Sequence, residues 1–193
     1  MPGSIVILYE KDEFMNMILF CGCTADEEAI IPALSRYASL LCFSPEEISS
    51  TLSSQQQNLV IGRYRHIPKL AGDAKGLLIL GGDLSQQEKN KIPSGFLSVF
   101  DADNRNAADT LVGTGGVAVS CGASARDTIS LASRSDGACV ASLQRSVRTL
   151  SGGVVEPRDV TIRLTREWKL FEILSFCAVM LLGNLDHDET LLL

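Results

Sequence analysis

The sequence predicts an α/β fold in which a mostly parallel sheet, flanked by helices, continues into an antiparallel β-meander. A continuous apolar run at residues 76–82, bounded by glycines, is typical of a strand that is buried on both faces. Segments with helical signals separate this run from the next two apolar runs, as they do in parallel sheets. Beyond residue 127 the apolar period becomes two, and little room is left for helices.

We expect a single α/β domain over residues 1–193, because a chain of this length can bury a core of its own. Its N-terminal part, residues 1–75, is predicted to be rich in helix with short strands. The run SIVILY (4–9) is the expected first strand, and NLVIGRY (58–64) is a later one. Helix starts with capping signatures are expected at Thr24, in a helix that reaches about residue 40, and at Ser44.

Residues 76–126 are predicted to form a Rossmann-like parallel core. The expected strands are 76–82, 95–103 and 116–122, and the expected helices are 85–92, which opens with a capping signature at Ser85, and 104–113.

The β-meander is predicted over residues 127–165, with turns at Ser135–Gly137 and Ser151–Gly153. A terminal helix follows at 166–184, and after Trp168 it is apolar nearly all round. Such a helix is buried either in the core or in a subunit interface, so a homo-oligomer formed through this helix is one alternative.

Composition and charge disfavour two classes of partner. The net charge is −6 and no dense basic stripe is present, whereas nucleic-acid backbones require one. The most apolar stretch, residues 173–185, has 13 uncharged residues, and a membrane-spanning helix needs about 20. We therefore expect neither nucleic acid nor membrane as a partner. The N-terminus also lacks the basic region of a signal peptide, which predicts a cytoplasmic protein.

The six cysteines are expected to be reduced thiols, since disulfide frameworks belong to oxidising compartments. Cys21 and Cys23 form a Cys-x-Cys pair that could bind a soft metal or cycle between redox states. A zinc site normally takes four ligands, and the sequence offers no second cysteine pair and only two histidines. The sequence therefore predicts no metal site.

No nucleotide-binding loop is found in the sequence. A phosphate-binding P-loop needs Gly-x-x-x-x-Gly-Lys-Ser/Thr, and no such string occurs. Residues 113–118 match a dinucleotide fingerprint formally, but they precede a predicted strand and are interpreted as a helix stop and turn. We predict no cofactor; a nucleotide with Mg²⁺ remains an alternative that no P-loop supports.

The strongest candidate site is the edge at which the predicted parallel strands end. Asp103 or Asn104 can cap the helix that follows, which leaves Asp101 and Arg105 without an explanation. Ligands favour the carboxyl ends of strands in open α/β sheets. The candidate ligand-binding residues at this edge are Asp101, Asp103, Asn104, Arg105, Cys121, Ser124 and Asp127. Ser124 with Asp127 also forms a capping pattern that needs no function.

Residues 76–184 resemble the latter half of the central domain of the Mur ligases. The resemblance rests on FDADN (100–104), on the meander at 138–164 and on the helix that ends in LLGN (181–184). It implies the Mur-ligase central-domain fold. The family's ATP-binding Gly-Lys-Thr loop is missing, and Thr165–Leu170 replaces its His-Asn-x-x-Asn segment. The resemblance therefore implies a cut-down relative that has lost its ligase chemistry, and no catalytic residue is carried over.

Two hypotheses follow. The first is a non-catalytic module that binds a small metabolite or a protein partner. The alternative is a small enzyme, a ligase or a nucleotide-dependent transferase, that works at the carboxyl-end edge of the sheet.

Overall fold

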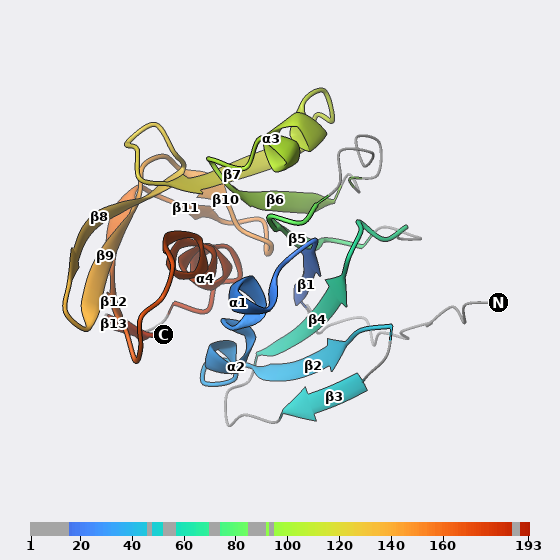
Figure 1. The fold of residues 1–193 in the computed structure, drawn as a ribbon, viewed down its shortest axis with the longest axis horizontal. Coiled ribbons are helices and arrows are strands. Elements are labelled where there is room, and N and C mark those ends of the chain that lie inside the picture. Colours follow the sequence, from blue (N-terminus) through green and yellow to red (C-terminus); the bar gives the residue numbers. More distant parts are fainter. Residues whose placement is uncertain are drawn as a thin grey trace.

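The computed structural model describes residues 16–45, 48–51, 57–69, 74–84, 92, 95–186 and 190–193. Most strands belong to one curved sheet, and β10 and β11 form a separate two-stranded ribbon (Figure 1). The elements are β1 (Asn16–Cys21), α1 (Ala25–Glu28), α2 (Ile31–Leu34), β2 (Ser39–Phe43), β3 (Ile48–Thr51), β4 (Asn58–Tyr64), β5 (Gly76–Leu80), β6 (Phe96–Asp101), α3 (Arg105–Leu111), β7 (Val117–Gly122), β8 (Ile129–Ser135), β9 (Ala138–Leu143), β10 (Val147–Arg148), β11 (Val154–Val155), β12 (Arg158–Arg163), α4 (Leu170–Leu182) and β13 (Thr190–Leu192).

The sheet is mostly parallel, with the order β13-β12-β9-β8-β7-β6-β5-β1-β4-β2-β3. Strand β1 lies inside it, between β4 and β5, and pairs with both in parallel. The parallel pairing continues from β5 through β6 and β7 to β8, and on the other side from β4 to β2. The predicted α/β class with a mostly parallel sheet is therefore confirmed.

The N-terminal part differs from the prediction. Its described residues hold strands β1 to β4 and two helices of four residues each, so the expectation of a helix-rich segment is wrong there. The helix that begins after Thr24 does not reach residue 40, because residues 39–43 pair with β4 instead. No helix follows the cap expected at Ser44, since Ile48–Thr51 forms β3, antiparallel to β2. The cap at Thr24 is therefore formed but starts only a short helix, whereas at Ser44 strand pairing overrides the local capping signal.

Strand β1 itself was not predicted, although its sequence NMILFC is almost wholly apolar and residues 18–21 are buried. The strand expected at residues 4–9 and the helix expected at 85–92 lie outside the described residues.

The second half of the chain follows the prediction closely. Strands β5, β6 and β7 and helix α3 lie where the sequence places them. The meander is present as β8 and β9, which pair antiparallel, and β12, which is antiparallel to β9. The last strand, β13, then adds to β12 in parallel, with Ile162 opposite Leu191.

Helix α4 lies in the middle of the molecule, and the curved sheet wraps around it (Figure 1). It packs against β6, β7 and β8 on one side and against α1 on the other. All residues from Phe171 to Leu182 are buried. The chain itself covers every face of the helix, which accounts for its apolar sequence without a subunit interface. A homo-oligomer stays a prediction. Among the described residues, no helix is long and apolar enough to cross a membrane.

The sheet curls until its last strand meets the segment after α2. The backbone N–H of Leu192 donates to the Tyr37 hydroxyl at 2.6 Å, and Arg36 donates to the Leu192 carbonyl at 3.4 Å. The ring of Tyr37 also lies 6.1 Å from that of Phe176 on α4. These contacts join β13 to the segment after α2 and close the structure around α4.

Candidate functional site

The carboxyl edge of the sheet has a topological switch point between β1 and β5. From β1 the chain passes to β2, β3 and β4 on one side of β1, and it then crosses to β5 on the other side. Ligands of open α/β sheets bind in the crevice that such a reversal leaves outside the strand ends. The crevice would lie between the loops that follow Cys21 and Leu80.

Backbone fills this position instead. The N–H of Gly81 donates to the Cys21 carbonyl at 3.0 Å, and that of Asp83 donates to the Gly22 carbonyl at 2.9 Å. A Cβ atom on Gly81 would lie 2.4 Å from the Cα of Cys23, and one on Gly22 would lie 2.6 Å from the Leu84 nitrogen. The two loops therefore touch through glycines, at a separation that leaves no room for a side chain between them.

The Glu27 carboxylate accepts hydrogen bonds from backbone N–H groups beside this contact. One oxygen accepts from the Thr24 N–H at 2.6 Å, and the other accepts from the Gly82 N–H at 3.1 Å. The Thr24 hydroxyl in turn accepts from the Glu27 N–H at 3.3 Å, which completes a capping box. In nucleotide-binding folds, backbone amides at the start of the helix that follows a strand are donors that hold phosphate. Here an anionic ligand would have to displace the protein's own carboxylate.

The acidic cluster after β6 serves the local backbone. Asp101 accepts from the Asp103 N–H at 3.0 Å, and Asn104 caps α3 by accepting from the Ala107 N–H at 3.1 Å. The Asn104 amide also donates to the Gly81 carbonyl at 2.9 Å, which ties α3 to the switch-point loops. Asp103 and Arg105 are exposed. Of the two caps that the sequence offers, Asn104 is therefore the one used.

The candidate residues after β7 likewise have structural roles. Asp127, only 9% exposed, accepts from the Ser124 N–H at 3.1 Å and so closes the loop on itself. Cys121 lies opposite Asp101 in the sheet, and its side chain is buried in the core that surrounds α4. Burial, and next the neighbouring Cys177, raises the pKa of the Cys121 thiol well above its usual range. Since the thiolate is the nucleophile, these surroundings disfavour a nucleophilic role for Cys121.

The Cys-x-Cys pair has no metal-site geometry. Cys21 is buried, and the Cys23 thiol donates to the Ile79 carbonyl at 3.4 Å. Burial, and next the charge of Glu27, raises the pKa of Cys23 well above its usual range. Within the described residues, no group of three or more His, Cys, Asp or Glu side chains could hold a metal ion.

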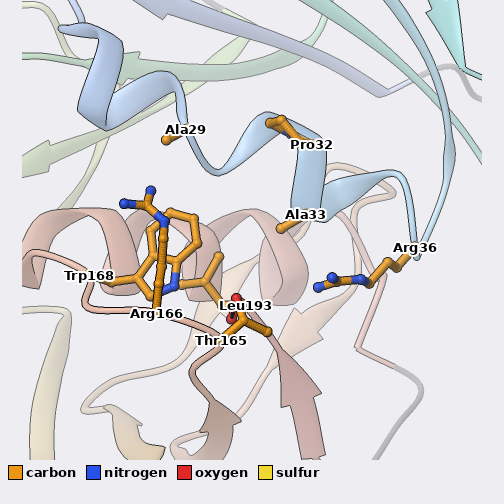
Figure 2. A pocket seen from close by; sticks show the side chains of 8 residues that line it. All are labelled: Ala29, Pro32, Ala33, Arg36, Thr165, Arg166, Trp168 and Leu193. Carbon is orange, nitrogen blue, oxygen red and sulfur yellow. Dashed lines mark hydrogen bonds between the residues drawn. The ribbon is translucent and has the colours of Figure 1, made fainter. Parts of the chain in front are cut away.

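A hollow of about 240 Å³ lies away from this edge, between the α1–α2 segment and the residues that lead into α4 (Figure 2). We call it the Trp168 hollow. It is lined by Ala29, Pro32, Ala33, Arg36, Thr165, Arg166, Trp168 and Leu193. A second, shallower hollow of about 460 Å³ lies beside β11, where Arg158 and Asp186 form an ion pair.

The Trp168 hollow contains a buried donor without an acceptor. Trp168 is only 6% exposed, and its indole Nε1–H has no hydrogen-bond partner within the described part of the chain. An unsatisfied buried donor costs about 1–3 kcal/mol. The guanidinium of Arg166 stacks on the indole, with its carbon 3.6 Å from the ring centroid. The sequence gives no sign of this site, since only the fold places Arg36 and the single tryptophan in the lining of one hollow.

Comparison with known proteins adds a likeness in fold. No protein-family model matches the sequence, and no curated protein matches it either. Among solved structures, the chain is similar to the murein peptide ligase Mpl from Psychrobacter arcticus 273-4, with 13% sequence identity and a TM-score of 0.49. The match covers 91% of this chain but only 45% of that protein. At this identity the likeness concerns the fold and says nothing about activity.

Proposed function

We propose that the protein is a non-catalytic α/β module that binds a small metabolite or a protein partner away from the carboxyl edge of its sheet. The observation that carries this proposal is the Glu27 carboxylate, which holds the amides of Thr24 and Gly82 at the switch point. The sequence also lacks a P-loop, whose lysine would neutralise phosphate charge. A relative of the Mur ligase central domain that has exchanged nucleotide binding for another ligand would combine these features.

The other candidate residues support the same proposal. Asp101, Asn104 and Asp127 each accept from a backbone N–H, so capping accounts for them without a ligand. The thiol of Cys121 is buried and its pKa is raised, as an inert core residue requires.

A thermal-unfolding screen tests the proposal. The protein is heated with ATP, AMP or NAD, each with and without Mg²⁺, and with cell-wall precursors. We expect no nucleotide to raise the melting temperature. A ligand present at about 100 times its Kd would add about 2.7 kcal/mol of stability, which such a screen detects.

The alternative is a small ligase or nucleotide-dependent transferase that uses the carboxyl edge, where Asp103 and Arg105 are exposed. It predicts the opposite outcome. If a nucleotide with Mg²⁺ stabilises the protein, and Asp101→Ala or Asp103→Ala abolishes the gain, the carboxyl edge is a ligand site. The proposal of a non-catalytic module would then be wrong.

A further inference from the structure

We propose that the turn between β8 and β9 is a site of covalent modification, at which Asp136 is converted into isoaspartate through a succinimide. Asp136 and Gly137 form the only Asp-Gly pair in the sequence, which has no Asn-Gly pair either. These two residues make up the turn, since Ser135 and Ala138 on either side of them are paired. The modification needs no ligand and does not depend on the function proposed above.

The two reacting groups are neighbours in the chain and have no other partners. The carboxyl carbon Cγ of Asp136 and the backbone nitrogen of Gly137 belong to adjacent residues, so rotation about the bonds of the Asp136 Cα brings them together. Both residues are exposed. Within the described part of the chain, the Asp136 carboxylate makes no hydrogen bond or ion pair, and the Gly137 N–H has no acceptor. Among these residues, no interaction of either group has to be broken before the two meet.

Gly137 leaves room for this approach. It has φ +76°, and a Cβ atom placed on it would meet nothing within 4 Å. Glycine itself has no Cβ, which allows its backbone to approach other groups closely and to adopt many angles. The Leu164 N–H donates to the Gly137 carbonyl at 2.8 Å, and the Ser135 hydroxyl donates to the Ala138 carbonyl at 3.3 Å. The flanking strands are therefore held in place while the exposed tip of the turn reacts.

The reaction has two steps that balance in atoms and need only water. In the first step, the Gly137 nitrogen attacks Cγ of the protonated Asp136 carboxyl group and loses its proton. The N–Cγ bond forms, a Cγ–O bond breaks, water leaves, and a succinimide ring remains. In the second step, water adds to the main-chain carbonyl carbon of Asp136, the bond from this carbon to the Gly137 nitrogen breaks, and a carboxylate is released. The chain then runs through Cβ and Cγ, and the mass is unchanged.

The product has a longer turn. An isoaspartate inserts one additional carbon atom into the main chain, and the geometry of a short hairpin turn depends on its length. The Gly137 carbonyl should therefore shift away from the Leu164 N–H. We expect the change to stay at this end of the meander, because β9 is paired with β12 as well as with β8.

The test compares the folded protein with a peptide of the same sequence. The protein and the synthetic peptide Leu131–Ala138 are incubated side by side at neutral pH for several weeks. Trypsin then cleaves the protein after Arg134 and Arg145. Isoaspartate in the fragment Ser135–Arg145 appears as a second chromatographic peak of unchanged mass, and fragmentation by electron transfer identifies the isoaspartyl linkage.

The ratio of the two rates shows whether the native turn reacts. We expect the protein to form isoaspartate at a rate within about tenfold of that of the peptide, a difference in barrier of no more than about 1.4 kcal/mol. Native domains are stable by about 5–15 kcal/mol, so fewer than about one molecule in a thousand is unfolded at any time. The proposal is wrong if the protein reacts more than about tenfold more slowly than the peptide, because only unfolded chains would then react. It is also wrong if isoaspartate accumulates faster at another aspartate than at Asp136.

Two variants and a matched control complete the experiment. Asp136→Asn offers ammonia as a better leaving group than water, so it should react faster, with a detectable gain in mass. Asp136→Glu would have to close a larger ring and should lose the isoaspartate signal. Asp109→Glu, at an exposed aspartate that precedes a threonine, should leave the rate at Asp136 unchanged. Both positions are exposed, so the variants should fold, and their unfolding midpoints verify this. If Asp136→Asn reacts no faster than the wild type, the turn prevents ring closure and the proposal fails.

Discussion

At the scale of single residues, the carboxylates of the sheet edge act on backbone N–H groups. Glu27, Asp101 and Asp127 each bind amides within a few residues of themselves, and Glu27 also binds Gly82 from the neighbouring loop. Acidic residues at the ends of parallel strands are therefore explained here by the donors that turns and helix starts leave without partners.

The first prediction concerns Glu27. Glu27→Ala removes the acceptor of two N–H groups and should lower the free energy of unfolding by about 1.5–3 kcal/mol, as the loss of a hydrogen bond to a charged group does. Glu27→Gln keeps one carbonyl oxygen and should lower it less. Chemical denaturation measures both, with Glu167→Ala, an exposed glutamate, as the control. Equal stability of the two Glu27 variants would contradict the prediction that a retained acceptor oxygen stabilises this contact.

The second prediction concerns Cys177. Burial raises the pKa of this thiol from 9.0 to about 12. Between these two values the folded protein holds a proton that the unfolded chain has lost, so stability falls as the pH rises through this window. Cys177→Ala removes this contribution, and its unfolding free energy should decline less steeply above pH 9.0 than that of the wild type. Urea unfolding at a series of alkaline pH values gives the unfolding free energy of both proteins as a function of pH. If the two curves are parallel, the raised pKa of Cys177 is refuted.

How much of the candidate site the sequence reveals also depends on residue-level detail. Asn104 as a cap follows from its place before an apolar-periodic run, and the structure confirms it. That Cys121 points into the core could not be foreseen, because the face of a strand that is covered depends on where α4 packs. The Trp168 hollow was missed for a related reason. Arg36 and Trp168 carry no shared local pattern, and only the closure of the sheet brings them together.

At the scale of elements, sequence patterns succeed where each strand is bounded by its own turn residues. Strands β5 to β9 lie between glycines or Ser–Asp–Gly turns and were predicted. Strands β2 and β3 were not predicted, because the proline and acidic residues that follow Ser44 resemble the start of a helix. The antiparallel pairing of Leu40 with Thr51 prevails there, since it completes the edge of a sheet whose centre is already buried.

The third prediction tests the contact between the loops after β1 and β5. Gly22 has φ +62°, and a Cβ on it would lie 2.6 Å from the Leu84 nitrogen. Gly113 has φ +80° with nothing within 4 Å of such a Cβ. Both alanine variants bear the left-handed backbone cost of about 1–2 kcal/mol. Gly22→Ala should lose about 1–3 kcal/mol more through overpacking. Thermal unfolding of the pair measures the difference, and equal losses would argue against a tight loop contact.

At the scale of the whole molecule, a single helix fills the core that the curved sheet encloses. The core around α4 includes residues from β1, β4, β7, β9, β12 and β13. Every face of α4 is covered, so an apolar stretch that could have indicated a subunit interface serves one chain.

The fourth prediction follows from this position. Phe176→Ala empties a fully buried site on α4 and should lower the free energy of unfolding by about 3–5 kcal/mol. Val112→Ala, at a side chain that is 72% exposed, should change it by no more than about 0.5 kcal/mol. Denaturant titration of both variants gives the comparison. A loss at Phe176 as small as that at Val112 would mean that α4 is not the centre of the core.

Because the sheet wraps around α4, the order in which the elements are synthesised affects folding. All strands from β1 to β12 precede α4 in the chain, and the hydrogen bond from Leu192 to the Tyr37 hydroxyl spans 155 residues. During synthesis the sheet face that α4 covers has no partner until residues 170–182 leave the ribosome. Contacts this distant in sequence make folding slow, and apolar surface exposed meanwhile promotes aggregation. We therefore expect a nascent chain stalled before α4 to aggregate unless a chaperone covers this face of the sheet.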